Sequence, residues 1–76
     1  MRVISKAALQ ALREAFPANT RVELIQMDDP FNTELVPGSL GTVRYVDDTG
    51  SIHVAWDCGS SLAVVYGVDI CRKTKA

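Results

Sequence analysis

The stretch from Leu40 to Leu62, LGTVRYVDDTGSIHVAWDCGSSL, constrains the fold more than any other part of the chain. Apolar residues alternate with small or polar ones from Ser51 to Trp56, which is typical of a strand with one buried face. The run Leu40 to Val46 is rich in β-branched and aromatic residues. Asp47 to Gly50 lies between the two runs and indicates a tight turn, because Asp and Gly tolerate turn dihedrals. These residues predict a β-hairpin.

The flanking segments extend this hairpin into a larger sheet. Asp57 to Ser60 forms a second turn signal, and Ser61 to Tyr66 follows it as the third strand of an antiparallel meander. Arg21 to Met27 also alternates and predicts a first strand, while Ile70 to Arg72 predicts a short closing strand. The expected fold is mainly β, of the α+β type: a five-stranded SH3-like β-barrel with an N-terminal α-helix packed on it.

The N-terminal segment carries the helical signal. Ser5 can cap a helix over residues 5–16, and Pro17 ends it because proline disfavours helical geometry in the preceding residue. Apolar residues recur at three- and four-residue spacing on one side: Leu9, Leu12 and Phe16, with Ala8 and Ala15 beside them. A helix this short is marginal alone. We expect it to cover an open end of the barrel, with a partner-binding helix as the alternative.

The whole chain of 76 residues is accounted for by one domain, with the helix at about 5–16, the barrel at about 20–72 and a frayed tail at 73–76. A hydrophobic fraction of 47% against 22% charged residues is ordinary for a globular protein. The formal net charge is −1, so no overall positive field draws the chain to nucleic acid.

Targeting and metal-binding signals are missing from the sequence. No apolar run approaches the roughly 18 residues of a transmembrane helix, and the first ten residues lack the apolar centre of a signal peptide. We therefore expect a cytoplasmic protein without membrane association. Cys58 and Cys71 lack the spacing of a zinc site, and we expect both to be reduced thiols.

The inventory of reactive residues does not favour catalysis. His53 is the single histidine, and no Ser/His/Asp or Cys/His motif surrounds it. The pairs Asp28-Asp29 and Asp47-Asp48 do not follow the alternating-oxygen pattern of a calcium loop. The expectation is a protein that is not an enzyme and has no catalytic residues, no metal and no cofactor.

A binding surface is better supported. Asp28 to Gly38 cannot continue a paired strand, and long ordered loops often carry function. This loop and the turn after Trp56 flank one side of the predicted barrel and suit a basic peptide. Phe31 either pins its loop or contacts the partner, and Trp56 is either core or contact. The candidate partner-binding residues are Asp28, Asp29, Phe31, Asp57, Ser60, Ser61 and Tyr66.

Several short motifs recur together in a known group of domains. They are Pro17 to Leu24, Met27 to Phe31, Pro37-Gly38, Gly41 to Val43, Val46 to Asp48, Ile52 to Val54, Trp56-Asp57, Gly59 to Leu62 and Gly67 to Asp69. From Leu12 onward the chain resembles a family of small bacterial and phage domains of unknown function. The resemblance implies an origin in phages or mobile elements and no known activity. Cys58 departs from the family pattern, which more often has Asn there.

A looser similarity, through Gly41 to Val43, Trp56-Asp57 and Gly59-Ser60, links the chain to the SH3-like repeats of Mind-bomb-type ubiquitin ligases, which bind peptides. Such a likeness of fold does not determine function.

Three functions remain open. The favoured one is a non-catalytic binding module, an accessory protein of a phage or mobile element that binds a host protein and either blocks or adapts it. A nucleic-acid-binding small barrel is the less favoured second, and it requires the basic residues to converge on one face. The third is a binder of a small ligand or nucleotide signal, which requires a concave pocket and is compatible with a homo-oligomer.

Overall fold

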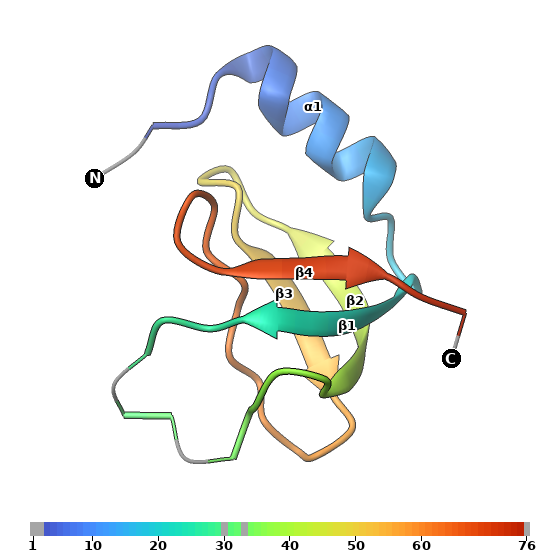
Figure 1. Cartoon of the computed structure of the whole chain (residues 1–76). Coiled ribbons are helices and arrows are strands. Elements are labelled where there is room, and N and C mark those ends of the chain that lie inside the picture. The colour runs from blue at the N-terminus through green and yellow to red at the C-terminus, as the bar shows by residue number, and fades with distance from the viewer. Residues whose placement is uncertain (1–2, 30, 33, 76) are drawn as a thin grey trace.

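The computed structural model describes residues 3–29, 31–32 and 34–75. It contains one helix and four strands, in agreement with the mainly β class (Figure 1). These elements are α1 (Lys6–Ala15), β1 (Arg21–Gln26), β2 (Leu40–Val46), β3 (Ile52–Trp56) and β4 (Ile70–Lys73). All four strands belong to one antiparallel sheet with the order β3-β2-β1-β4.

The predicted hairpin is confirmed as β2 and β3, which pair from Gly41 opposite Trp56 to Val46 opposite Ile52. The turn at its tip is held by Asp47, whose Oδ1 accepts hydrogen bonds from the amides of Thr49 and Ser51. Gly50 completes the turn with φ of +86°, a conformation that L side chains rarely adopt. The local turn chemistry thus sets the register of this pair.

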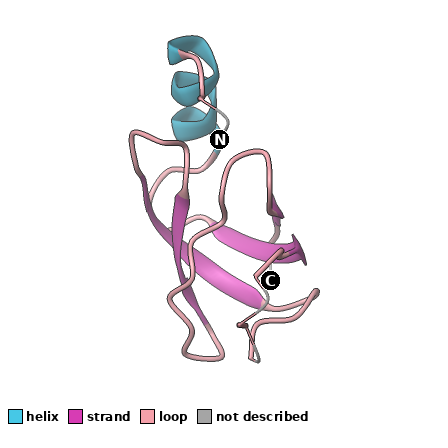
Figure 2. Ribbon diagram, turned by 90° about the vertical axis from the view of Figure 1, so that its left-hand side faces the viewer, coloured by secondary structure: helices cyan, strands magenta, loops and turns pink. Residues whose placement is uncertain are grey.

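The helix begins where the sequence predicts. The Ser5 hydroxyl accepts a hydrogen bond from the Ala8 amide at 3.1 Å and so caps the first turn. The stripe formed by Leu9, Leu12 and Phe16 packs against the core, yet no residue of α1 is fully buried. The helix stands over one end of the sheet (Figure 2) and covers it incompletely.

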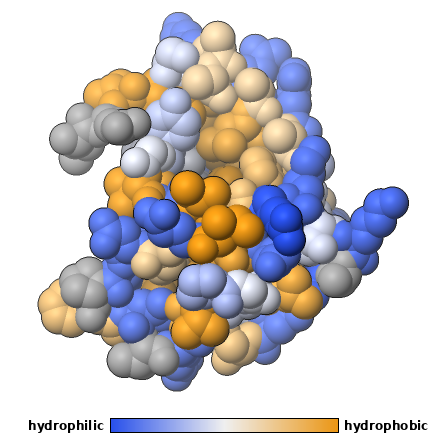
Figure 3. All heavy atoms as spheres, in the orientation of Figure 1, coloured by the Kyte–Doolittle hydropathy of each residue, from blue (hydrophilic) through white to orange (hydrophobic). Residues whose placement is uncertain are grey.

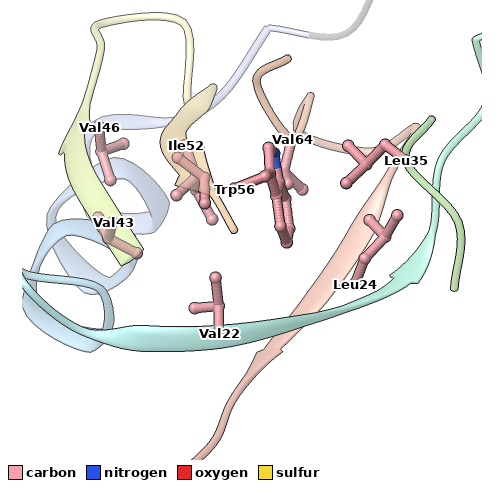
Figure 4. Packing of buried hydrophobic residues seen from close by; sticks show 9 residues of the cluster. Val22, Leu24, Leu35, Val43, Val46, Ile52, Trp56 and Val64 are labelled. Carbon is pink, nitrogen blue, oxygen red and sulfur yellow. The ribbon is translucent and has the colours of Figure 1, made fainter. Parts of the chain in front are cut away.

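The core lies between the sheet and the loops that return across it (Figure 4). Val22 and Leu24 of β1 are fully buried, as predicted, and Trp56 is 3% exposed, which makes it a core residue. Leu35 reaches the core from the long loop between β1 and β2 and is 2% exposed. The remaining buried members are Val43, Val46, Ile52, Val54 and Val64.

The prediction of a closed five-stranded SH3-like barrel is wrong, because the described chain forms an open four-stranded sheet. The expected strand from Ser61 to Tyr66 is reduced to one isolated bridge between Val64 and Ile52. Continuing that register would place Leu62 opposite Val54. The Leu62 carbonyl instead accepts the indole N–H of Trp56 at 2.8 Å. The Trp56 side chain therefore occupies the carbonyl oxygen that Leu62 would otherwise offer to the Val54 amide in a continued strand pairing.

Candidate functional site

The structure places the candidate residues of the long loop at the end of the sheet opposite α1 (Figure 1). Phe31 is 90% exposed and does not pin its loop. Its amide donates to the Asp29 carboxylate at 2.9 Å, which forms a local turn. The residue that anchors the loop is Leu35, whose amide donates to Asn32 Oδ1 at 2.8 Å. The sequence pattern did not separate these two apolar residues.

The turn after β3 lies at the same end of the molecule and carries Asp57, Ser60 and Ser61 (Figure 1). Asp57 forms a bidentate ion pair with Arg21, at 2.9 and 2.7 Å. Ser60 Oγ accepts from the Leu62 amide at 3.3 Å, so this hydroxyl organises its own turn. Ser61 is exposed. Asp57 and Ser60 thus stabilise local structure, and none of the three residues lines either of the cavities described below.

The segment before β4 reaches the opposite end, beside α1 (Figure 1), and its Tyr66 lines a cavity of about 400 Å³. The candidate residues are thus divided between the two ends of the molecule. The wall of this cavity is mostly apolar and comes from the N-terminal arm, the β2–β3 turn and the segment before β4. Its lining residues are Val3, Ile4, Asp48, Thr49, Ser51, Val65, Tyr66 and Val68.

Gly50 sets the shape of this cavity. A Cβ atom at Gly50 would lie 2.9 Å from Ile4 Cδ1 and 3.1 Å from Tyr66 Cβ, which is closer than side chains normally approach. The arm and the segment before β4 therefore meet over the turn because residue 50 has no side chain. The sequence indicates that Gly50 is a turn residue, but it contains no signal for the contacts with Ile4 and Tyr66.

A second cavity of about 140 Å³ continues from the first, and Val65 and Tyr66 line both. It lies between Leu12 of α1, with the C-cap residue Phe16, and the start of β4 at Ile70 and Cys71. Figure 3 shows apolar residues extending across the centre and upper part of this face. Four residues that line one or both cavities are each between 38% and 51% exposed: Val65, Tyr66, Val68 and Ile70.

Asp69 joins the segment before β4 to the long loop. Its side chain is 9% exposed, and its two oxygens accept from the amides of Asp28 at 2.7 Å and Val65 at 3.0 Å. A buried carboxylate is stabilised when amides satisfy its oxygens in this way. Asp28 therefore contributes its backbone here.

The pair formed by His53 and Asp47 was missed by sequence analysis. His53 Nε2 lies 2.8 Å from Asp47 Oδ2, and the imidazole stacks on the Tyr45 ring with centroids 4.3 Å apart. The predicted hairpin already brings His53 close to its neighbours, because it pairs His53 with Tyr45 and places Asp47 in the turn six positions before His53. The pair is not among the lining residues of these two cavities, and its hydrogen bond joins the β2–β3 turn to β3.

The environment of Asp47 changes its titration. Burial of the carboxyl acts to raise its pKa, but hydrogen bonds from the Thr49 hydroxyl, the His53 ring and the amides of Ser51 and Thr49 outweigh burial. The pKa of Asp47 is held well below its usual range. The Asp57 pKa is lowered for a related reason, the hydrogen bond from Arg21.

Three arginines meet carboxylates or carbonyls rather than forming a basic face. Arg72 pairs with Glu23 across β4 and β1 at 2.7 Å, and Arg13 joins Asp48 at 2.8 Å as well as the Val46 carbonyl. Arg21 pairs with Asp57. These contacts join α1 to the end of β2 and the β2–β3 turn, β1 to β4, and β1 to the turn after β3.

The two cysteines lie in different environments. Cys58 is exposed, whereas burial raises the pKa of Cys71 to about 11 and keeps it a thiol. Within residues 3–29, 31–32 and 34–75, no three His, Cys, Asp or Glu side chains are grouped to hold a metal ion. None of the helices described is long and apolar enough to span a bilayer.

Comparison with known proteins gives one informative result. No curated protein and no solved structure is significantly similar to the chain. A family model described as a domain of unknown function, DUF4314, matches residues 5–74, which include α1 and all four strands. The match confirms the resemblance to a family of small domains without known activity, and the chain belongs to the DUF4314 family.

Proposed function

We propose that the chain is a non-catalytic binding module that holds an apolar segment of a partner protein in the 400 Å³ cavity beside α1. The observation that carries this proposal is the cavity lining, where Val65, Tyr66 and Val68 remain 38% to 43% exposed. Exposed apolar side chains gathered at one place on a small domain are typical of an interaction site.

The partner is a protein of the host, and the chain acts as an accessory factor of a phage or mobile element. This part of the proposal is supported by the resemblance to domains found in such elements. The absence of a recognisable catalytic motif in the sequence, and the structural role of the His53–Asp47 pair, favour binding over chemistry.

The electrostatics favour a protein over nucleic acid. Arg21 and Arg72, two of the residues that a nucleic-acid site would need, are each engaged by a carboxylate at 2.7 Å. Phosphate binding would have to compete with these ion pairs. The formal net charge of −1 adds no long-range attraction.

A small ligand is the second candidate, because the volume of the cavity falls within the roughly 300 to 1,000 Å³ of small-molecule sites. Such a ligand would stabilise the folded protein in proportion to its concentration over Kd. A rise in melting temperature with a nucleotide or other metabolite, in the absence of any bound protein, would support this second function.

The test uses a photoreactive, benzophenone-bearing amino acid in place of Val68, which lines the cavity and is 43% exposed. The control carries it in place of Arg44, an exposed residue of β2 outside both cavities. In a bacterial lysate we expect one protein to be crosslinked from position 68 and not from position 44. A second variant, Val68→Asp, should abolish capture without lowering the melting temperature. Equal crosslinking from both positions would contradict the proposal.

A further inference from the structure

The outer edge of β4 differs from the outer edge of β3 in its backbone hydrogen bonds. Ile52 and Trp56 of β3 bond residues of the segment that follows, whereas the described residues offer no such partner to β4. The Thr74 amide donates to the Arg21 carbonyl at 2.9 Å, which marks residues 21 and 74 as a hydrogen-bonded pair. Hydrogen-bonded and non-hydrogen-bonded pairs alternate in an antiparallel ladder. The next hydrogen-bonded pair is Glu23 with Arg72, so the backbone groups of Cys71 and Lys73 point away from β1.

The same phase follows independently from the other side of β1. The amides of Val43 and Leu24 bond the carbonyls of Thr20 and Ser39, which directs residues 20, 22 and 24 of this strand towards β2. Residues 21 and 23 are left to bond β4. Among the described residues, no backbone or side-chain group is hydrogen-bonded to the outward edge of Cys71 and Lys73.

The surroundings of this edge have a definite chemistry. Residues 70–75, ICRKTK, contain Arg72, Lys73 and Lys75 and no acidic residue. Arg72 is neutralised by Glu23, while Lys73 and Lys75 are exposed. The smaller cavity lies beside the start of the edge and is lined by Leu12, Phe16, Ile70 and Cys71. A row of backbone donors and acceptors, an apolar hollow and two exposed ammonium groups thus lie together.

We propose that the partner adds an extended, acidic segment as a further strand along the free edge of β4. Its backbone bonds Cys71 and Lys73, an apolar side chain enters the hollow between α1 and β4, and its carboxylates face Lys73 and Lys75. A second copy of the chain does not fit this edge, because two β4 strands would bring their Arg and Lys residues together. The inference rests on the proposed function and extends that site to the edge of β4, because Val65 and Tyr66 line both the larger cavity and this hollow.

The first measurement is amide exchange followed by NMR. In the free protein, the amides of Cys71 and Lys73 should exchange much faster than that of Arg72, which bonds within the sheet. The probe is a short peptide with the sequence Glu-Thr-Glu-Thr-Val, because residues two apart share a face, as Lys75, Lys73 and Cys71 do, and its control carries lysine in place of both glutamates. The acidic peptide should slow exchange at Cys71 and Lys73 by about tenfold or more. The control peptide should have no effect there.

The second measurement uses Lys73→Pro, with Lys73→Ala as the matched control. Both variants remove the ammonium group, but only proline removes the outward N–H, and an edge strand tolerates proline at such a position. Loss of one hydrogen bond predicts that Lys73→Pro binds the acidic peptide about five- to tenfold more weakly than Lys73→Ala. Equal binding by the two variants, or slow exchange at Cys71 and Lys73 before peptide is added, would overturn strand addition.

The two proposals fail in different ways. If crosslinking from position 68 captures a partner and Lys73→Pro captures it as well as Lys73→Ala, the binding module stands and strand addition is wrong. If position 68 captures no protein and the acidic peptide does not bind, both proposals are wrong.

Discussion

The two edges of the sheet differ in how the chain finishes them. Along β3, Ile52 exchanges both backbone bonds with Val64, and the Trp56 amide donates to the Ser60 carbonyl. Along β4, the outward groups of Cys71 and Lys73 meet no described partner. An uncovered edge invites pairing with another chain, and proteins commonly protect such edges with lysine. Lys73 and Lys75 are exposed along this edge.

The covered edge should depend most strongly on Trp56. The Trp56→Ala substitution removes a ring that is 3% exposed and also the bond to Leu62, so we expect a loss of about 3 to 5 kcal/mol in the free energy of unfolding. Denaturant unfolding measures this change. Trp56→Phe keeps much of the ring volume and should lose less. A loss below about 1 kcal/mol for Trp56→Ala would contradict the placement of the ring in the core.

Proline scanning of β4 sharpens the comparison at the open edge. Arg72→Pro removes a donor that bonds β1 and should destabilise the protein by about 3 kcal/mol. Lys73→Pro removes a donor that faces solvent and should change stability by less than about 1 kcal/mol. Thermal unfolding of the two variants provides the measurement. Similar losses at both positions would show that the phase of the ladder is wrong.

Acid should weaken the hairpin that carries β3. The pKa of Asp47 is lowered in the folded protein, whereas an unfolded aspartate titrates at about 3.9. The stabilisation is therefore present above about pH 4 and is lost as the pH falls towards the folded pKa. In melting curves recorded from pH 7 to pH 2, Asp47→Asn should show a smaller acid-induced decrease than the original chain. An identical decrease would indicate that Asp47 is not the responsible group.

Phe31 should matter least to stability. The residue is 90% exposed, so Phe31→Ala should change the free energy of unfolding by less than about 0.5 kcal/mol. Leu35→Ala in the same loop is the matched comparison, with an expected loss of about 2 to 5 kcal/mol. A large loss from Phe31→Ala would instead place this ring against the core.

The elements that the sequence predicts correctly are those specified by neighbours in the chain. Ser5 and Pro17 delimit α1, and Asp47 to Gly50 determines the β2–β3 turn, because capping and turn bonds connect residues only a few positions apart. The strand expected from Ser61 to Tyr66 failed because its pairing depends on a competitor, the Trp56 indole, which takes the Leu62 carbonyl. The alternation of apolar residues along the sequence contains no information about this competing hydrogen bond.

The candidate site was harder to predict than the fold. A closed barrel would bring the loops that carry Tyr66, Phe31 and Asp57 to one side, so the sequence predicts a single binding surface there. The open sheet separates them, and the cavity beside Tyr66 depends on Ile4, which is distant in sequence. The division of roles between Phe31 and Leu35 likewise depends on which residue Asn32 bonds. Such contacts arise from tertiary packing and have no local signature.

Asp69 also links two segments that are far apart in the sequence. Its buried carboxylate accepts hydrogen bonds from the amides of Asp28, at the start of the long loop, and Val65, before β4. Loss of this one side chain would leave both amides without their acceptor, so a single substitution would loosen the two segments together.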